Sequence, residues 1–504
     1  MKRLISIMII TLLYAISLNS SVWSQIATID EARIIAQNWI DLIIQKKGSW
    51  GETKSAVLED IYEFMHDDRV LGYFCKVMPK GYIIVSLRKE LAPVKAYSAT
   101  CNLYPECTEG MVAILKQKMR RIQYKIEQKV GLIETAQTED VAKIVEINYQ
   151  KTWENIKNKR INLKKSHIPE ESKTNYQEGD YLLTSSWHQG YPYNDFCPDL
   201  GCSNTPNGKA FVGCVATAGA QLMRYWNWPP HGSGSPYNDP YDWSNMPDSI
   251  NASASRIQYD AVAELCSEVG KAVDMDYGCN GSSAYIYCWW AGCESLEKAF
   301  HERFRYQDII DKKDRNYDSS SEWFNRIKGE INRNRPVIYG ITGHALVADG
   351  WQIVGNIKQY HLNLGWGGGK PNKQCWQSMG HTNTWYTLHE IPCSDQDKEE
   401  ILVKIVPDGI VGSTIAGTYS VRSFPYRYFD RDASGSNATF LAGQSIQFLH
   451  EITITGTGTS SSPIRFQGTT SSNTSLFSRG DQSKGVLIKG GAINLYNQGT
   501  IKFF

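Results

Sequence analysis

The stretch that decides the fold of this chain is Phe211-Val-Gly-Cys-Val-Ala-Thr-Ala-Gly-Ala-Gln-Leu-Met-Arg-Tyr-Trp226. Its small and apolar residues predict a helix that begins near Cys214, directly after a loop that contains Gly213. Free backbone amides and the positive end of a helix dipole stabilise a thiolate, so the sequence predicts a lowered thiol pKa at Cys214. The thiolate is the nucleophilic form, and we expect a reactive cysteine here. The alternative is a buried, inert thiol.

Two blocks further along the chain supply the other residue types that a cysteine nucleophile needs. His344 lies between Gly343 and Ala345, whose small size lets another segment approach the ring. Asn363 opens a glycine-rich run, and its side-chain oxygen can accept a hydrogen bond from an imidazole. Both lie within the roughly 130 to 150 residues that separate the cysteine from His and Asn in papain-like enzymes. We predict His344 as the base and Asn363 as the residue that orients it.

Three more residues are weighed for the same site. The side-chain amide of Gln189 can donate to an oxyanion beside the cysteine N–H, although a surface amide is the simpler interpretation. Trp366 can cover the hydrogen bond of the imidazole and exclude water, or it can be an ordinary core aromatic. His361 is a rival base. It stands two residues from Asn363 in a predicted strand, too far for a ring-orienting contact, so we expect a strand residue.

Length and composition indicate the number of domains and the general class of the protein. With 504 residues the chain should form about three domains, at roughly 150 residues per domain. Hydrophobic residues at 41% and charged residues at 21% are typical of globular protein. The net charge of +1 argues against nucleic-acid binding, because no basic field is present to neutralise phosphates.

The N-terminus has the pattern of a signal peptide. Lys2 and Arg3 precede a short apolar run that is followed by small residues, so we predict residues 1–24 as the signal peptide. The run is too short to cross a membrane comfortably, although an uncleaved anchor is the alternative. We expect a secreted or cell-surface protein without a membrane span in its mature form.

Twelve cysteines follow the predicted signal peptide. Export permits disulfides, and close pairs such as Cys101 and Cys107 are candidates, but connectivity cannot be read from sequence. A zinc site from Cys279, Cys288 and Cys293 is conceivable, yet the spacings fit no paired CxxC pattern. We therefore predict no metal and no cofactor.

Composition divides the chain further. Residues 25–150 indicate a small α+β unit, with helices over 29–43 (Asp30 as the cap) and 112–131 and a buried strand over 81–86. Residues 151–177 are polar and basic, which is typical of a linker open to proteolytic processing or of an exposed helix. These segments contain no combination of nucleophile, base and orienting residue.

Residues 178–408 contain every candidate site residue. The pattern predicts an α half, with helices over 255–270, 293–304 and 321–332, followed by a β half, with strands over 335–341, 346–351 and 359–364. Beyond residue 408 the alternating pattern, punctuated by Gly, Asn and Ser, predicts a small all-β module over 409–504, with strands over 445–455 and 492–504.

These blocks resemble the streptopain family of secreted bacterial cysteine peptidases, a papain-like group. The matching blocks are Leu-Leu-Thr…Trp-His-Gln…Pro-Tyr-Asn…Cys-Pro198, Gly-Cys-Val-Ala-Thr-Ala…Gln-Leu-Met-Arg-Tyr…Pro229, Arg-Pro-Val-Ile-Tyr339, Gly-His-Ala-Leu-Val-Ala-Asp-Gly-Trp351 and His-Leu-Asn-Leu-Gly-Trp-Gly-Gly368. The N-terminal unit is similar to the family's inhibitory propeptide at Gly-Tyr-Ile-Ile-Val-Ser…Leu-Ala-Pro-Val-Lys-Ala-Tyr-Ser98. It departs from that pattern at Leu-Arg-Lys-Glu90, where the family has an acidic turn.

The resemblance implies an α+β fold class, with a papain-like peptidase domain between a small α+β propeptide and an all-β module. It implies Cys214 as nucleophile, His344 as general base and later acid, Asn363 as orienting residue, Gln189 in the oxyanion hole and Trp366 as a shield. The expected protein is a zymogen that acts on protein or peptide substrates and is inhibited by its own propeptide. Two alternatives stay open: a transamidase or amidase with the same dyad, and a catalytically idle adhesion or binding protein.

Overall fold

The structure is a computed structural model. It describes residues 25–108, 110–161, 176–251, 253–366, 384–387, 389–392, 399–411, 414–419, 426–429, 432–443, 445–448, 452–470, 472, 474–478, 486–488 and 491–503. The predicted signal peptide, residues 1–24, lies outside the described residues. Among the helices that are described, none combines the length and apolar character needed to cross a membrane.

The chain divides into two compact units. The first consists of Met1–Tyr97, Leu115–Asn162 and His389–Pro392, and the second of Ser98–Ile114, Leu163–Leu388 and Cys393–Phe504. The first unit runs to residue 162, so helix α5 (Gln150–Lys157) lies within the segment predicted as a linker and is part of this unit. Its packing against α2 fixes it there, since Asn38 Nδ2 donates to Ile156 O at 2.9 Å. The boundary predicted at residue 150 stays a prediction.

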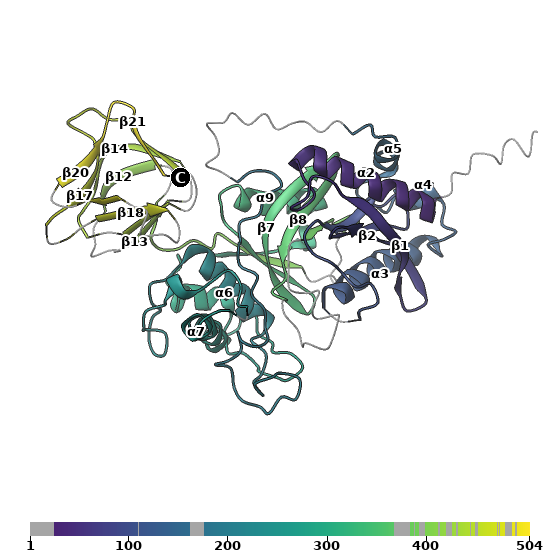
Figure 1. Ribbon diagram of the computed structural model, residues 1–504, viewed down its shortest axis with the longest axis horizontal. Coiled ribbons are helices and arrows are strands. Elements are labelled where there is room, and N and C mark those ends of the chain that lie inside the picture. The colour runs from purple at the N-terminus through teal and green to yellow at the C-terminus, as the bar shows by residue number, and fades with distance from the viewer. Residues whose placement is uncertain are drawn as a thin grey trace, which may run out of the picture. The chain divides into compact units, whose positions relative to one another are not determined.

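The N-terminal unit consists of antiparallel strands and the helices that pack beside them. Its elements are α2 (Ile29–Lys47), β1 (Val57–His66), β2 (Arg69–Met78), β3 (Tyr82–Ser86), β4 (Val94–Ser98), most of α3 (Gly110–Val130), α4 (Thr138–Ala142) and α5. Strands β1, β2 and β3 pair antiparallel in that order, and α2 packs against them (Figure 1). The α+β character predicted for this unit is confirmed.

Helix α2 shows which sequence signals set its ends. The expected cap was Asp30, but the N-cap is Thr28, whose side chain accepts from Glu31 N while Glu31 accepts from Thr28 N. This reciprocal capping box satisfies two amides, whereas Asp30 lies already inside the first turn. Gly48 ends the helix with a left-handed φ of 84°.

In the segment predicted as papain-like most of the helices precede most of the strands, as expected, although the short strand Asp311–Asp314 comes before the last helix. The helical elements are α6 (Cys214–Trp226), η2 (Trp243–Asn245), α7 (Arg256–Ala272), α8 (Leu296–Glu302), η3 (Arg315–Tyr317) and α9 (Ser320–Ile331). The strands are β5 (Asp311–Asp314), β6 (Val337–Ile341), β7 (His344–Val354), β8 (Ile357–Asn363), β9 (Thr384–Tyr386) and β10 (Glu400–Val403). They pair antiparallel in the order β9-β8-β7-β6-β10-β5. Helix α6 packs against both α7 and β7 (Figure 1).

The predicted boundaries differ from the observed ones where local geometry intervenes. Helix α8 begins only at Leu296, because the preceding residues form a loop closed by the Cys288–Cys293 disulfide. Strand β7 begins at His344, two residues before the predicted start, and β8 ends at Asn363, one residue before the predicted end.

The C-terminal residues form an all-β module, as predicted. Its strands are β11 (Ile410–Val411), β12 (Thr414–Tyr419), β13 (Tyr426–Phe429), β14 (Ala433–Phe440), β15 (Ser445–Phe448), β16 (Ile452–Gly456), β17 (Ile464–Gly468), β18 (Thr474–Ser478), β19 (Val486–Ile488), β20 (Gly491–Leu495) and β21 (Gly499–Phe503). They form two sheets, β11-β13-β15-β18-β19 and β20-β17-β14-β16-β21, with β12 paired to β14. The stretch 445–455, expected as one strand, contributes β15 and β16 to different sheets, and the strand expected over 492–504 is divided into β20 and β21 by a turn.

One apolar core lies between these two sheets. Phe429 and Phe448 come from one sheet and Phe440 and Phe466 from the other, and all four are fully buried. Successive strands alternate between the sheets for much of the module, which explains why neighbours such as β13 and β15 run parallel. The sequence pattern predicted strands but carried no information on this order.

Candidate functional site

The position of Cys214 is set by the glycine before it. Gly213 caps α6 with a φ of 87°, a backbone conformation that side chains disfavour. A Cβ there would also lie 2.7 Å from Met275 Sδ. Thr217 fastens the turn, because its N–H and its hydroxyl both donate to Gly213 O, at 3.0 Å and 2.9 Å. Cys214 is therefore held at the first position of the helix, where the sequence predicted it.

The sulfur of Cys214 is free and half-buried. Backbone N–H groups of Ala345, Val215 and Cys214 itself act as hydrogen-bond donors to it and lower its pKa. Burial acts in the opposite direction and is larger, so the pKa of the thiol is raised overall. The expected amides are present, but the predicted lowering of the pKa is not found in this arrangement. The Ala345 contact brings the start of β7 to the sulfur.

His344 is buried at the beginning of β7. Its Nε2 lies 2.8 Å from Leu364 O, and Trp366 stacks on its ring with centroids 4.0 Å apart and an interplanar angle of 27°. Burial lowers the pKa of His344 to about 4, and the hydrogen bond to the Leu364 carbonyl opposes that shift only in part. The imidazole is therefore neutral at neutral pH.

The Leu364 carbonyl also determines the tautomer of His344. A carbonyl oxygen can only accept, so the proton of the neutral ring must sit on Nε2. The other nitrogen, Nδ1, then carries a free lone pair and is the basic atom. The sequence predicted a residue that fixes the tautomer, and a main-chain group does so here.

Asn363 adopts a different set of partners from the predicted one. Its Oδ1 accepts from Gln221 Nε2 at 3.0 Å and from Gly365 N at 3.2 Å. Its Nδ2 donates to Ser185 O at 2.8 Å and to Gln221 Oε1 at 3.1 Å. The two amides thus form a closed pair that ties the end of β8 to α6. Asn363 therefore fixes the position of the next residue, Leu364, whose carbonyl lies against His344 Nε2.

Gln189 lies beside the loop that leads to Cys214. Its carbonyl accepts from Val212 N at 2.9 Å, two residues before Cys214. The side chain is half-buried, and no hydrogen bond of it is found within the described part of the chain. Its predicted role in an oxyanion hole stays a prediction.

His361, the rival base, belongs to another cluster. Its Nδ1 lies 2.6 Å from Asp349 Oδ1, and Tyr181 stacks on its ring at 4.3 Å. Asp349 also accepts from Leu183 N at 3.0 Å, so the pair joins β7 and β8 to the preceding segment. This is the strand role expected for His361.

Three contributors to the site were missed by sequence reasoning. The Leu364 carbonyl and the Ala345 amide are main-chain groups that every residue has, so no residue type marks them. Gln221 had a weak signal, since a polar residue within the apolar run of α6 must find buried partners. That signal alone did not identify Asn363 as the partner.

The cysteine geometry removes the zinc alternative. Cys279 is bonded to Cys202, and Cys288 to Cys293, so these sulfurs are not available as metal thiolates. Cys107 is disulfide-bonded as well.

An acidic cluster is the arrangement closest to a metal site among the described residues. Oxygen atoms of Asp239, Glu264 and Glu268 lie within 4.8 Å of one another. Tyr241 donates to Glu268 at 2.6 Å, and burial, with Asp239 and Glu264 adding to it, raises the pKa of Glu268 to about 7. The Tyr241 hydroxyl and protonation of Glu268 reduce the repulsion between the three carboxylates. The cluster contains none of the predicted site residues.

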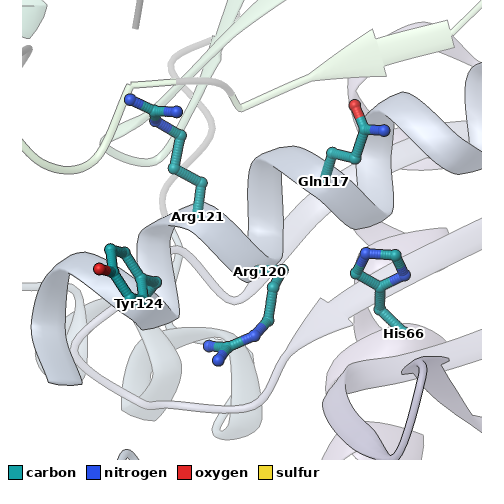
Figure 2. A pocket seen from close by; sticks show the side chains of 5 residues that line it. All are labelled: His66, Gln117, Arg120, Arg121 and Tyr124. Carbon is teal, nitrogen blue, oxygen red and sulfur yellow. The ribbon is translucent and has the colours of Figure 1, made fainter. Parts of the chain in front are cut away.

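An open pocket in the N-terminal unit is likewise separate from the predicted chemistry. Figure 2 shows its lining, which comes from the end of β1 and from α3: His66, Gln117, Arg120, Arg121 and Tyr124. Arg120 pairs with Glu127 at 2.9 Å. No predicted catalytic residue lines this pocket.

The part of the chain that contains the predicted site residues is similar to known proteins. Residues 187–372 match the model of the Peptidase C10 family. Streptopain of Streptococcus pyogenes serotype M28 (strain MGAS6180) is 34% identical over 213 residues, which cover 36% of this chain and 51% of streptopain. The thiol protease/hemagglutinin PrtT of Porphyromonas gingivalis is 32% identical over 203 residues, 36% of this chain and 22% of PrtT.

Two solved structures also match parts of this chain. A fragment of Prevotella intermedia prointerpain A with a cysteine-to-alanine mutation is 21% identical, covers 68% of this chain and 97% of that chain, and has a TM-score of 0.45. Active wild-type interpain A of the same organism is 25% identical, with coverages of 46% and 97% and a TM-score of 0.35.

The chain spans about half the length of streptopain, and a smaller share of PrtT. The family match contains Cys214, His344, Asn363 and Trp366, and it confirms the predicted resemblance. Over residues 187–372 the chain is therefore similar to the Peptidase C10 family and to streptopain, which supports a streptopain-like cysteine peptidase domain in this part of the chain.

Proposed function

We propose that this chain is a cysteine endopeptidase, made as a zymogen and exported, in which Cys214 and His344 carry the chemistry. The observation that carries the proposal is the free sulfur at the start of α6, with the Ala345 N–H as a donor to it. Ala345 follows His344 directly, so nucleophile and base belong to elements that meet at the sulfur.

The chemistry begins with proton transfer. Both groups are neutral in this arrangement, so His344 Nδ1 takes the thiol proton as the sulfur attacks the peptide carbonyl carbon. The carbonyl oxygen becomes an oxyanion, for which the Cys214 N–H and the Gln189 amide are the proposed donors. The imidazolium then protonates the leaving amine, and the C–N bond breaks to leave a thioester.

Hydrolysis completes the cycle. A water molecule loses a proton to Nδ1 and attacks the thioester carbonyl, and the thiol leaves with the proton that returns from the ring. The products are a carboxylic acid and the regenerated thiol. Throughout, the Leu364 carbonyl holds the Nε2–H, and Trp366 covers one face of the ring.

The N-terminal unit is the proposed inhibitory propeptide. Support comes from its resemblance to the family's propeptides and from its compactness as a separate unit. Because α5 is bonded into this unit, we propose that processing occurs after Lys157, within the predicted segment that ends at residue 177.

Product analysis of a denatured protein substrate tests the proposed function. The purified, secreted protein should release peptides with new free carboxyl termini, and N-terminal sequencing of its mature form should begin between residues 158 and 178. Incorporation of added amines in place of hydrolysis would indicate a transamidase. Absence of both reactions would indicate a binding protein and contradict the proposal.

A further inference from the structure

An aromatic loop projects from the segment between α7 and α8. It comprises Tyr285-Ile-Tyr-Cys-Trp-Trp-Ala-Gly-Cys293, and we call residues 285–293 the Trp loop. The Cys288–Cys293 disulfide closes its tip. At its base, Leu296 N donates to Tyr285 O and Glu297 N to Ile286 O, both at 3.0 Å. The loop is therefore fastened at both ends.

The rings of the Trp loop are turned to solvent. Trp289 is 84% exposed, Tyr285 56% and Trp290 45%. They contact one another edge to face, with centroids 5.1 Å apart for Tyr285 and Trp290 and 6.2 Å for the two tryptophans. Water is a poor solvent for such a cluster, and contiguous exposed apolar surface of this kind marks an interaction site. Trp and Tyr are also the residues that dominate binding energy at interfaces.

The root of the Trp loop is attached to the elements that carry the catalytic pair. Leu296, which follows the loop, packs so closely on α6 that a Cβ at Gly219 would lie 2.7 Å from its Cδ1. On the other side, a Cβ at Gly340 of β6, the neighbour of β7, would lie 2.8 Å from Ile286 Cδ1. The loop is thus held rigidly against both halves of the site.

The segment that leads into the loop passes the nucleophile itself. Ser282 Oγ donates to Phe211 O at 2.6 Å, and Ser282 O would lie 3.0 Å from a Cβ at Gly213. Only two residues separate Ser282 from Tyr285. The segment that leads into the Trp loop is therefore packed against the turn that precedes Cys214.

We propose that the Trp loop binds extended polypeptide substrates through their large apolar side chains, at a distance from the bond that is cleaved. This rests on the proposed peptidase function, since the attachment of the loop's root beside Cys214 selects a polypeptide as the occupant. The loop itself contains no charged residue, and Lys312, which lies 5.4 Å from the Tyr287 ring centroid, does not make the basic cluster that binds an anionic lipid surface. Its polar side-chain groups are chiefly tyrosine hydroxyls and indole N–H groups, few partners for the many hydroxyls of a glycan.

Peptide binding to the full chain tests this without requiring catalysis. The full chain with Cys214→Ala is titrated, by calorimetry, with an extended peptide rich in Leu and Phe and with its Ser- and Gln-rich counterpart. The apolar peptide should bind, and Trp289→Ala should weaken it by about tenfold or more, as expected for an interface tryptophan. The matched control is Ile257→Ala on α7, which removes another exposed apolar side chain (62% exposed) and should leave binding unchanged.

Each other outcome overturns the proposal. No binding of the apolar peptide, equal binding of both peptides, or equal loss in Trp289→Ala and Ile257→Ala would do so. Preferred binding of a soluble oligosaccharide or of phosphatidylcholine vesicles would reassign the loop to a glycan or lipid. Failure of the proposed function would appear instead as a wild-type protein without hydrolysis, which this binding measurement does not involve.

Discussion

Buried ionisable side chains form a charged pair in the N-terminal unit, whereas around Cys214 they are neutral. In the N-terminal unit, Arg88 and Glu90 are both fully buried and joined by two hydrogen bonds of 2.9 and 2.7 Å. The remaining Arg88 donors reach the carbonyls of Ile133 and Ala136, both at 2.8 Å, and Gln25 Oε1 at 3.1 Å. The charge of Arg88 is thus matched by an opposite charge and by dipoles.

At the site, burial instead favours the neutral forms. It raises the pKa of Cys214 and lowers that of His344 to about 4, and no ionic partner of either is found among the described residues. A change of protonation in a buried ion pair leaves the partner's charge uncompensated, which is costly. A neutral thiol and a neutral imidazole can exchange a proton with each other and with a substrate. The contrast separates a pair that maintains the fold from the residues that we propose to react.

Cys214→Ala should produce the largest effect. Removing the nucleophile of a comparable protease lowers kcat by about 10⁶, and we expect a loss of that order in peptide hydrolysis, together with arrested maturation. The assay is hydrolysis of a denatured protein by the secreted form. The matched control is Cys266→Ala, which removes another free thiol, buried on α7, and should retain activity. Similar losses in the two variants would contradict the special role of Cys214.

Glu90→Ala tests the structural role of the buried ion pair in the N-terminal unit. It leaves the Arg88 guanidinium buried without its anion, which costs about 3–5 kcal/mol. Hydrogen exchange of α3 amides in the Cys214→Ala background measures this loss within the N-terminal unit. The control, Asp41→Asn, breaks the exposed Lys159–Asp41 pair and should cost at most about 1 kcal/mol. Equal costs would mean that the buried pair is not structural.

The acid limb of the pH–rate profile tests the neutral imidazole. A pKa of about 4 for His344 keeps the base unprotonated down to that pH, whereas a free imidazole with a pKa near 6.5 would be mostly protonated at pH 5. We expect kcat/KM at pH 5 to be about thirtyfold above the value for a free imidazole. The sign also holds for stability, which falls as pH drops from 6.5 toward 4, because the unfolded chain binds the proton more tightly. An acid limb near 6.5 would mean that the ring leaves Leu364 before catalysis.

Asn363→Ala should have the smallest of the four effects. It frees the loop that carries the Leu364 carbonyl, so we expect kcat to fall about tenfold with little change in KM, the usual size for a group that orients another. The control is Gln359→Ala, which breaks the buried Gln352–Gln359 amide pair (2.8 Å) on the same strands. Both should cost about 1–3 kcal/mol of stability, but only Asn363→Ala should slow turnover.

How much could be predicted from the sequence differs between side chains and main chain. The helix that begins at Cys214, the strand near His344 and the aromatic cover supplied by Trp366 all follow from residue types and their spacing. The partner of His344 could not be predicted, because the acceptor is a carbonyl and the side chain of the predicted partner, Asn363, is occupied by Gln221.

Boundaries failed where a local contact overrides periodicity. The pattern of apolar residues placed the start of α8 at 293, but the Cys288–Cys293 bond holds that stretch in a loop. The raised pKa of Cys214 was missed for a similar reason. The dipole and amides at the start of α6 are readable from sequence, whereas the depth of burial that outweighs them depends on the packing of β7 against that helix.

The most direct test of a neutral, mutually reactive Cys214 and His344 is labelling of the secreted protein with a peptidyl electrophile, followed by mass spectrometry over the nine cysteines that follow residue 178. We expect one adduct, on Cys214, and much slower labelling in His344→Ala. An adduct on Cys197 or Cys266 instead, or a labelling rate at Cys214 that is indifferent to His344, would contradict it.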